Sequence, residues 1–482
     1  MAILEERGRF WWSDNPVPDG HFAPEESITG LLSIDDDGRI AVDLNDYFPN
    51  KHGPFGLLAR DGSPLNRSIS GILRESNRRV LLIGINPGGG QVRTTGISHE
   101  RYIATDCLVG NAILGPKDLP PTFAEMEIDL SGLEAWFWFR SVQVSTSYWQ
   151  ISAEYKRPEP AIYEINDGIL SFEFYVAGSI PFVDKSDEIA IKEKALANFA
   201  LAKRESIDQL RDRFRFFEDL MILLTDSEFR LAWPVLRWDE QIEFTWYFAR
   251  LRSEVVAAEP KTHECLTFFP RVRDSFGAIW NNWKSKRQEY GPGFYLYLGT
   301  RRGFSLYAEH RFVNLIWGIE AFHRTKFPTN PDSMKVRIDN IVDQIENRSD
   351  QKLVRRGLRF AHEPSLEERI FSVFKGLAIN LDQSRLRAFA FACADARNAI
   401  SHFGAQRHGG AYSEFIMDLE KKSRAIATLS HCLLLQEIGV EPDIIVNWVT
   451  KSWGAFRIKY SFVEVGLLDK EVLRPDAHNA PS

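Results

Sequence analysis

The chain has 482 residues, of which 44% are hydrophobic, 12% aromatic and 26% charged, as is typical of a globular protein of two or three domains. Its formal net charge of −7 excludes a uniformly basic protein that coats nucleic acid. The charge is uneven, because residues 1–300 carry 33 basic and 44 acidic side chains, whereas residues 301–482 carry 26 and 22. We therefore expect a polyanionic partner to approach the C-terminal part.

The cysteines and the N-terminus indicate a cytoplasmic protein. The four cysteines lie far apart without a CxxC pair, so we expect free thiols rather than a disulfide framework. The first ten residues, MAILEERGRF, contain no apolar signal segment. No apolar run approaches the length of a membrane-spanning helix, and we expect no membrane association.

The first part of the chain predicts β-strands. Short aliphatic and β-branched runs flank Asp- or Asn-containing turns that end in Gly, which predicts hairpins over residues 28–44 and 162–174. The wholly apolar run 80–85 is typical of a strand buried on both faces. The glycine-rich segment 84–90 that overlaps its end lacks the Lys and Ser/Thr of a phosphate-binding P-loop, and we interpret it as a turn. One amphipathic helix is expected over residues 206–224.

Beyond Gly303 the apolar residues recur with the period of helices. Segments punctuated by Pro and Gly predict amphipathic helices over residues 304–322, 334–345, 366–381, 385–403, 412–438 and 443–453. The sequence therefore predicts an α+β protein. Its β-rich N-terminal domain is expected over residues 1–292 and an all-α helical bundle over residues 303–473.

One polar motif stands out on the helix expected over residues 385–403. Arg397, Asn398 and His402 form an Arg-Asn-x-x-x-His pattern that, at the residue frequencies of this chain, arises by accident about 0.04 times. Asn398 and His402 are one turn apart and lie almost opposite the apolar stripe, with Asp395 on the same side and Arg397 on the flank. The stripe expected to face the core consists of Phe389, Cys393, Ala396, Ile400 and Phe403.

From geometry alone, this polar ridge is either a solvated helix face with an Arg–Asp pair or a functional site. Gly404 is expected to end the helix just after it. No HExxH motif, Cys/His cluster or spaced set of carboxylates accompanies the ridge, so we predict neither a metal ion nor a cofactor.

The ridge resembles the R-N-x-x-x-H signature of HEPN domains, which are helical bundles that act widely as ribonucleases in prokaryotic defence. Upstream, RFVNLIWGIEAFHR at 311–324 resembles the first helix of the ApeA-type HEPN group. Residues 8–12, 29–33 and 38–44 are similar to the β-rich N-terminal domain that accompanies this HEPN domain in ApeA-like abortive-infection proteins.

The resemblance implies an endoribonuclease of antiphage defence that cleaves RNA without a metal ion, by attack of a ribose 2′-OH on the adjacent phosphate. In this interpretation Arg397 holds the phosphate, Asn398 orients the imidazole or a phosphate oxygen, and His402 transfers protons. Asp395 and Glu320 either line the same cleft or are ordinary surface acids. HEPN enzymes typically pair two such helices, which implies a homodimer or a higher even oligomer.

In this interpretation, the N-terminal domain is expected to sense a phage-derived trigger or to restrain the HEPN pair.

Two other functions remain open. A non-catalytic HEPN module that binds or regulates is the first alternative, although such modules typically lack the Arg or the His. The second alternative is a ligand-binding protein whose aromatic-rich β part carries the function, since 13 Trp residues occur in the chain.

Overall fold

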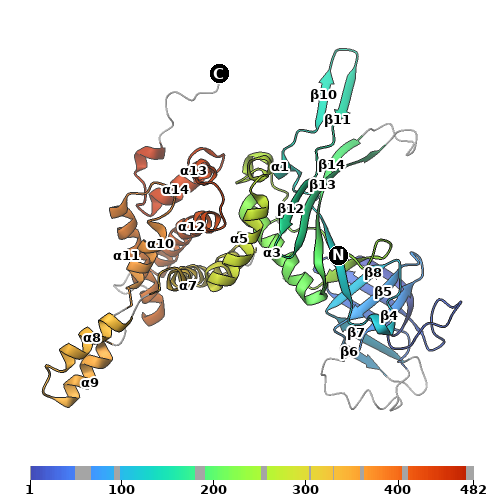
Figure 1. Ribbon diagram of the computed structural model, residues 1–482, viewed down its shortest axis with the longest axis horizontal. Helices are drawn as coiled ribbons and strands as arrows, with labels where there is room; N and C mark the ends of the chain where they lie inside the picture. The colour runs from blue at the N-terminus through green and yellow to red at the C-terminus, as the bar shows by residue number, and fades with distance from the viewer. Residues whose placement is uncertain are drawn as a thin grey trace. The chain divides into compact units, whose positions relative to one another are not determined.

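The computed structural model describes residues 2–48, 67–91, 98–179, 190–250, 258–302, 306–328, 331–358, 363–403 and 411–473 (Figure 1). The chain forms two compact units. The first, called the sheet unit below, consists of residues 1–134, 139–218 and 230–252. The second, called the helical unit, consists of residues 135–138, 219–229 and 253–482. Among the described residues, no helix is long and apolar enough to cross a membrane.

The sheet unit is built on one antiparallel sheet. Its 14 described strands follow the order β12-β13-β14-β9-β15-β16-β8-β5-β4-β1-β2-β3-β7-β6. The strands are β1 (Ala2–Trp12), β2 (Ile28–Asp35), β3 (Ile40–Leu44), β4 (Ile69–Leu73), β5 (Arg79–Ile83), β6 (Asn86–Gln91), β7 (His99–Ala104), β8 (Asp106–Gly110), β9 (Thr122–Asp129), β12 (Ala161–Ile165), β13 (Gly168–Ser179), β14 (Ala190–Ser206), β15 (Val235–Arg237) and β16 (Glu243–Phe248).

The turns predicted from Asp, Asn and Gly are present in the sheet. β2 pairs with β3 across the turn that ends at Gly38, whose φ of +74° is the left-handed conformation that Gly adopts without strain. β12 and β13 pair directly around Gly168. The apolar run at β5 is buried along most of its length. These predictions are confirmed. The elements could be predicted because strand alternation and turn chemistry are both local signals.

The glycine-rich segment after β5 differs from its interpretation as a turn. Residues Asn86–Gln91 form the edge strand β6, which pairs with β7. Pro87 can be accommodated there because an edge strand has backbone groups that need no partner strand. The interpretation was therefore wrong for this part of the segment.

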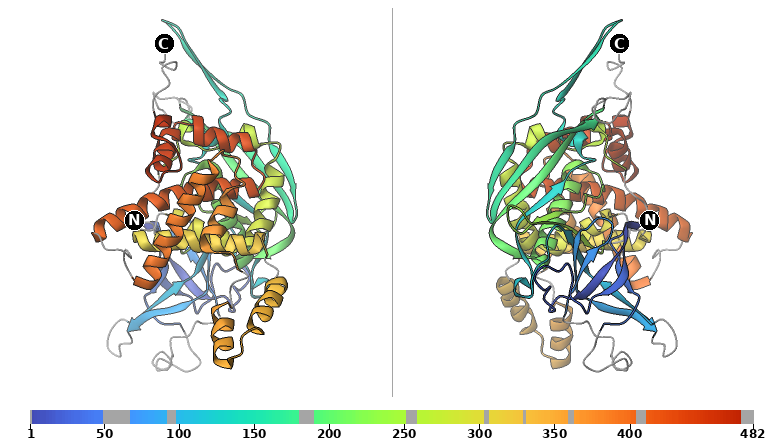
Figure 2. Two further views of the ribbon diagram at one scale, coloured as in Figure 1. Left: turned by 90° about the vertical axis from the view of Figure 1, so that its left-hand side faces the viewer. Right: turned by 90° about the vertical axis from the view of Figure 1, so that its right-hand side faces the viewer.

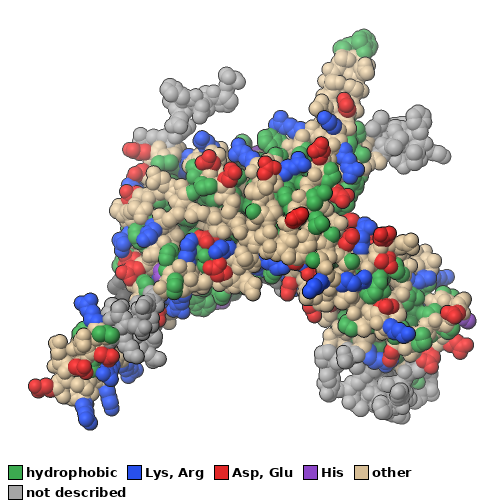
Figure 3. Space-filling view, viewed as in Figure 1, with side chains coloured by type: hydrophobic (Ala, Val, Ile, Leu, Met, Phe, Trp, Pro, Cys, Tyr) green, Lys and Arg blue, Asp and Glu red, His purple; other side chains and the backbone are tan. Residues whose placement is uncertain are grey.

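A two-stranded hairpin, β10 (Val142–Thr146) and β11 (Ile151–Tyr155), forms a sheet of its own. One face carries the cross-strand partners Val144 and Ala153 next to Thr146 and Ile151, whereas Ser and Gln alternate on the other. At its tip Trp149 is 90% exposed. Figure 2 shows this hairpin extending beyond the rest of the sheet, and Figure 3 shows the apolar side chains at its tip.

The helical unit contains the bundle that the sequence predicts. Its helices of eight or more residues are α5 (Phe276–Tyr290), α6 (Pro292–Arg301), α7 (Ala308–Lys326), α8 (Pro331–Val342), α9 (Arg348–Gly357), α10 (Leu366–Phe374), α11 (Gln383–Phe403), α12 (Tyr412–Glu437), α13 (Pro442–Lys451) and α14 (Ala455–Glu464). Helix α3 (Ile207–Thr225) matches the helix expected over 206–224, and its residues from Asp219 onward belong to this unit.

Helix α7 organises the bundle. It packs against α5, α6, α10, α11 and α12. Its buried apolar side chains recur at three- and four-residue steps and include Phe312, Leu315, Ile316, Ile319 and Phe322. Helices α5 and α6 precede Gly303, where the periodicity predicted the helices to begin. A β-rich N-terminal region followed by a helical C-terminal region is nevertheless confirmed.

Candidate active site

Helix α11 carries Arg397 and Asn398 of the polar motif away from its buried apolar stripe. Phe389, Cys393 and Ala396 of the expected stripe are buried, at 2%, 0% and 5% exposure, and Ile400 is half-buried. This apolar face fixes the rotation of the helix about its axis, since burying it stabilises one orientation against α7 and α10. Arg397 is consequently half-buried and Asn398 is exposed.

Arg397 contacts a carboxylate on a neighbouring helix. Its Nη2 lies 3.7 Å from Oε2 of Glu320 on α7, and its Nη1 donates a hydrogen bond of 3.4 Å to Oδ1 of Asn398. The structure therefore brings together Arg397, Asn398 and Glu320 from two helices that meet in the bundle. Asp395 is half-buried on α11, and Arg397 forms its ion pair with Glu320 on α7.

His402 is placed only by its backbone. It belongs to the last turn of α11, one turn beyond Asn398. Its side chain, that of Phe403, and the whole of Gly404 lie outside the part of the chain that the structure describes. The contact between His402 and the other motif residues accordingly stays a prediction.

Glu320 is shared between two arginines. Its Oε1 lies 3.8 Å from Nη1 of Arg369 on α10, while its other oxygen faces Arg397. The Arg369 side chain is only 5% exposed, and that of Glu320 is 19% exposed. Neither contact reaches hydrogen-bond distance, so one carboxylate balances two guanidinium charges without saturating their donors.

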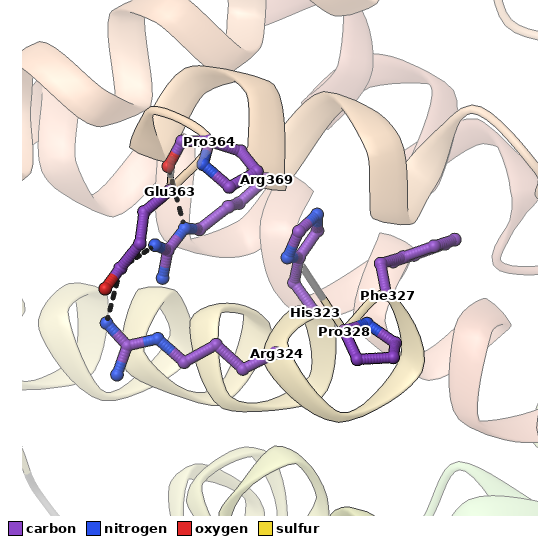
Figure 4. Close-up of a pocket in the computed structure, with 7 residues that line it drawn as sticks. All are labelled: His323, Arg324, Phe327, Pro328, Glu363, Pro364 and Arg369. Carbon is purple, nitrogen blue, oxygen red and sulfur yellow. Dashed lines mark hydrogen bonds and ion pairs between the residues drawn. The ribbon is translucent and has the colours of Figure 1, made fainter. Parts of the chain in front are cut away.

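The ion-pair network continues from Arg369 to Glu363 and Arg324. Arg369 Nη2 donates to the Glu363 carboxylate, and its Nε donates to the backbone oxygen of Pro364 at 3.0 Å (Figure 4). Arg324 Nη2 lies 3.7 Å from the same carboxylate. His323, one turn after Glu320 on α7, is 4% exposed. Burial, and then the positive charges of Arg369 and Arg324, lower its pKa below the ordinary value, which keeps the imidazole neutral at pH 7.

This network was not found by the sequence reasoning. Arg369 and Glu363 contact α7 residues that are more than 30 positions away in the sequence. In the sequence, a helix start rich in Glu and Arg is typical of an ordinary solvent-exposed turn. A signal was available on α7, where Glu320 and His323 interrupt an otherwise apolar face at a spacing of three residues.

The arrangement suits the binding of an anion. Arg397 keeps its charge at every accessible pH and presents a planar fork of donors, which matches the oxygens of a phosphate. Throughout the described ranges, no group of three or more His, Cys, Asp and Glu side chains is arranged to hold a metal ion.

Comparisons with known proteins identify both halves of the chain. The family described as ApeA N-terminal domain 1 matches residues 5–283, and the family described as Apea-like HEPN matches residues 313–444, which include most of α7 and all of α10 and α11. No curated protein and no solved structure matches the chain. Because the first match covers more than half of the 482 residues and the second follows it, the protein belongs to the ApeA family, in which this N-terminal domain precedes an Apea-like HEPN domain.

Proposed function

We propose that the helical unit cleaves RNA without a metal ion, and that the protein does so in antiphage defence by abortive infection. An Apea-like HEPN domain indicates a nuclease-type function in antiphage defence, and the finer proposal is the cleavage of RNA by Arg397, Asn398 and His402. The observation that carries it is the half-buried Arg397 guanidinium, which Glu320 and the exposed Asn398 flank in the last two turns of α11. A fixed and charged fork at a surface is what phosphate recognition needs.

The mechanism assigns a separate role to each group. The ribose 2′-OH attacks the adjacent phosphorus, and the bond to the 5′-oxygen of the next nucleotide breaks. Arg397 stabilises the negative charge that develops on the phosphate oxygens. His402 removes the 2′-OH proton or protonates the leaving oxygen, since a histidine side chain can exchange a proton near neutral pH. The products are a 2′,3′-cyclic phosphate and a 5′-hydroxyl.

A composite site in an oligomer completes the proposal. One copy of α11 supplies one motif imidazole, whereas the reaction needs a proton acceptor and a proton donor. Two copies that face each other across a two-fold axis supply both, so we propose a homodimer or a higher even oligomer. The N-terminal domain, proposed over residues 1–292, senses a phage-derived trigger and controls the helical domain proposed over 303–473. The proposed compartment is the cytoplasm.

A basic stripe on the helical unit favours RNA as the partner. Arg348, Lys352 and Arg356 are exposed at four-residue spacing on one side of α9. Figure 3 shows Lys and Arg side chains along the α8–α9 pair, with Asp and Glu side chains among them. Such a stripe attracts the phosphate backbone of RNA independently of its sequence.

The aromatic content gives less support to the ligand-binding alternative. Several of the Trp residues are packing groups, since Trp11, Trp136, Trp246, Trp280 and Trp283 are all fully buried. A buried indole cannot serve as a platform for a ligand, so these five residues give no support to a ligand-binding function.

A cleavage assay tests the proposal. Activated full-length protein is incubated with labelled RNA, with and without EDTA, beside Arg397→Ala, Arg397→Lys and His402→Ala. Loss of a transition-state contact lowers the rate by about 10²–10³, so both alanine variants should show no detectable cleavage. The lysine variant should recover little, because an ammonium lacks the fork.

The control variant is Arg424→Ala on α12, whose guanidinium is 49% exposed and pairs with Glu464 at 3.1 Å. It removes the same charge from another part of the bundle and should cleave at the wild-type rate. Cleavage that requires Mg²⁺, or that persists in His402→Ala, contradicts the proposal. RNA binding without cleavage in the wild type supports the non-catalytic HEPN alternative.

A further inference from the structure

A polar pocket lies beside the candidate active site. It has a volume of about 360 Å³ and is lined by residues of α7, of α10 and of the segments after α7 and before α10: His323, Arg324, Phe327, Pro328, Glu363, Pro364 and Arg369 (Figure 4). Arg369 connects it to Arg397, because both guanidinium groups face the Glu320 carboxylate, at 3.8 and 3.7 Å. The pocket is therefore next to the motif but is not formed by it.

Arg369 leaves one buried donor group unused. Its Nε and Nη2 donate to Pro364 and Glu363, whereas Nη1 is buried and has no hydrogen-bond partner. In Figure 4, Nη1 points toward α7, away from these two acceptors. A buried donor without an acceptor costs free energy, and a native protein generally retains one where a ligand or a water satisfies it.

The charges in the pocket favour an anion. Among the described lining residues, two guanidinium groups, of Arg324 and Arg369, lie against the carboxylate of Glu363. The other nearby acid, Glu320, is already shared with Arg397. The Arg324 side chain is 65% exposed, so an incoming anion can reach it from solvent. The remaining wall contributes an aromatic ring, Phe327, whose centroid lies 5.1 Å from that of His323.

We propose that this pocket is a nucleotide subsite, which binds a backbone phosphate of RNA next to the phosphate held by Arg397. The inference rests on the proposed ribonuclease function and names a further part of its substrate-binding surface. Arg324 binds the phosphate oxygens in place of its present contact with Glu363, and Nη1 of Arg369, which makes no hydrogen bond, supplies a second donor while it stays beside Glu320. Phe327, 37% exposed, offers a face on which the attached base can stack.

An RNA-binding experiment tests the subsite directly. The probes are labelled oligonucleotides, each with one neutral methylphosphonate linkage at a different position and with 2′-deoxyribose at the cleavage site to prevent reaction. Affinity is measured by fluorescence anisotropy. In the wild type, the methylphosphonate at one position other than the scissile linkage should weaken binding about tenfold. This is the effect expected for the loss of a charge-assisted hydrogen bond.

The variant and its control identify which arginine is responsible. In Arg324→Gln the same neutral linkage should weaken binding less than twofold, because the partner of that phosphate is already gone. In Arg424→Gln, with a similarly exposed guanidinium, the tenfold effect should remain. Arg369→Lys, which keeps the buried charge, should also reduce the effect. An equal effect in the wild type and Arg324→Gln overturns the inference.

A second measurement separates this inference from the proposed function. Thermal unfolding is followed in inorganic phosphate and in chloride at equal ionic strength. Replacing chloride by phosphate should raise the unfolding midpoint of the wild type and of Arg424→Gln by more than it raises the midpoint of Arg324→Gln. If RNA is cleaved but neither measurement depends on Arg324, the inference is wrong and the ribonuclease proposal stands. If phosphate binding depends on Arg324 but no RNA linkage does, the pocket binds a free phosphate compound and the RNA subsite is refuted.

Discussion

We expect the buried imidazole of His431 to make the helical unit sensitive to acid. On α12, its Nε2 lies 2.8 Å from the backbone oxygen of Leu223, and its Nδ1 lies 3.6 Å from Oδ1 of Asp226 and 3.4 Å from Nη1 of Arg301. Its ring lies beside Tyr297 and Trp448, with centroids 5.8 and 5.0 Å away. Burial lowers the pKa of His431 from 6.5 to about 4, although the Asp226 carboxylate opposes this.

The sign and size of the effect follow from linkage. The folded protein keeps His431 neutral, whereas the unfolded chain protonates it near pH 6.5. The stabilisation is therefore complete above pH 6.5 and is lost as the pH falls toward 4. At about 1.4 kcal/mol per pH unit, this interval corresponds to about 3 kcal/mol of unfolding free energy.

Urea unfolding of the full chain at pH 7 and pH 4 measures the effect. Tryptophan fluorescence includes a signal from the helical unit, since Trp448 lies beside His431. His431→Phe keeps a ring in the core but cannot be protonated, so it should lose about 3 kcal/mol less than the wild type on acidification. His263→Phe, at a half-exposed position, should behave as the wild type. Equal acid sensitivity in the wild type and His431→Phe would refute the reasoning.

Two further substitutions test the ion pairs of the helical unit. Glu320→Gln should lower the unfolding free energy by about 2 kcal/mol, since Arg369 is buried but keeps Glu363, and it should reduce RNA cleavage less than Arg397→Ala does. Urea unfolding and the cleavage assay measure these two effects. Asp219→Asn should cost about 3–5 kcal/mol in urea unfolding, because this 2%-exposed carboxylate contacts both Arg287 and Arg302. If Asp219→Asn lowered the unfolding free energy by less than about 1 kcal/mol, the ion pairs of Asp219 with the two arginines would not have the importance assigned to them.

Local patterns allowed much of the fold to be predicted. The β2–β3 and β12–β13 hairpins follow from alternation and turn residues within a few positions of each other. Helix α5 was not predicted because Trp280 and Trp283 made an aromatic-rich segment resemble the strands before it. The β10–β11 hairpin was missed because its Val, Ser and Gln alternation is short and its apolar face has no core to bury it.

The site was predictable only where a single helix determines it. The positions of Arg397 and Asn398 follow from the period of α11, since the apolar stripe fixes which side is exposed. The pairing of Arg397 with Glu320 depends on how α7 packs against α11, which no local pattern specifies. From helix geometry Asp395 was an equally reasonable partner, and tertiary packing favours Glu320. For the same reason, no sequence signal identified Arg369 as the second arginine at this carboxylate.

The shared carboxylate explains how such a site can be both stable and ready to bind. A half-buried guanidinium without a nearby acid is costly, whereas one held by a bidentate ion pair has few donors left for a substrate. Glu320 lies 3.7 Å from Arg397 and 3.8 Å from Arg369, so it offsets both charges without binding either tightly. In the proposed reaction, an RNA phosphate takes over the donors of Arg397 while Glu320 stays with Arg369. The buried charge is then balanced before and after binding, and little rearrangement is needed before the oxyanion forms.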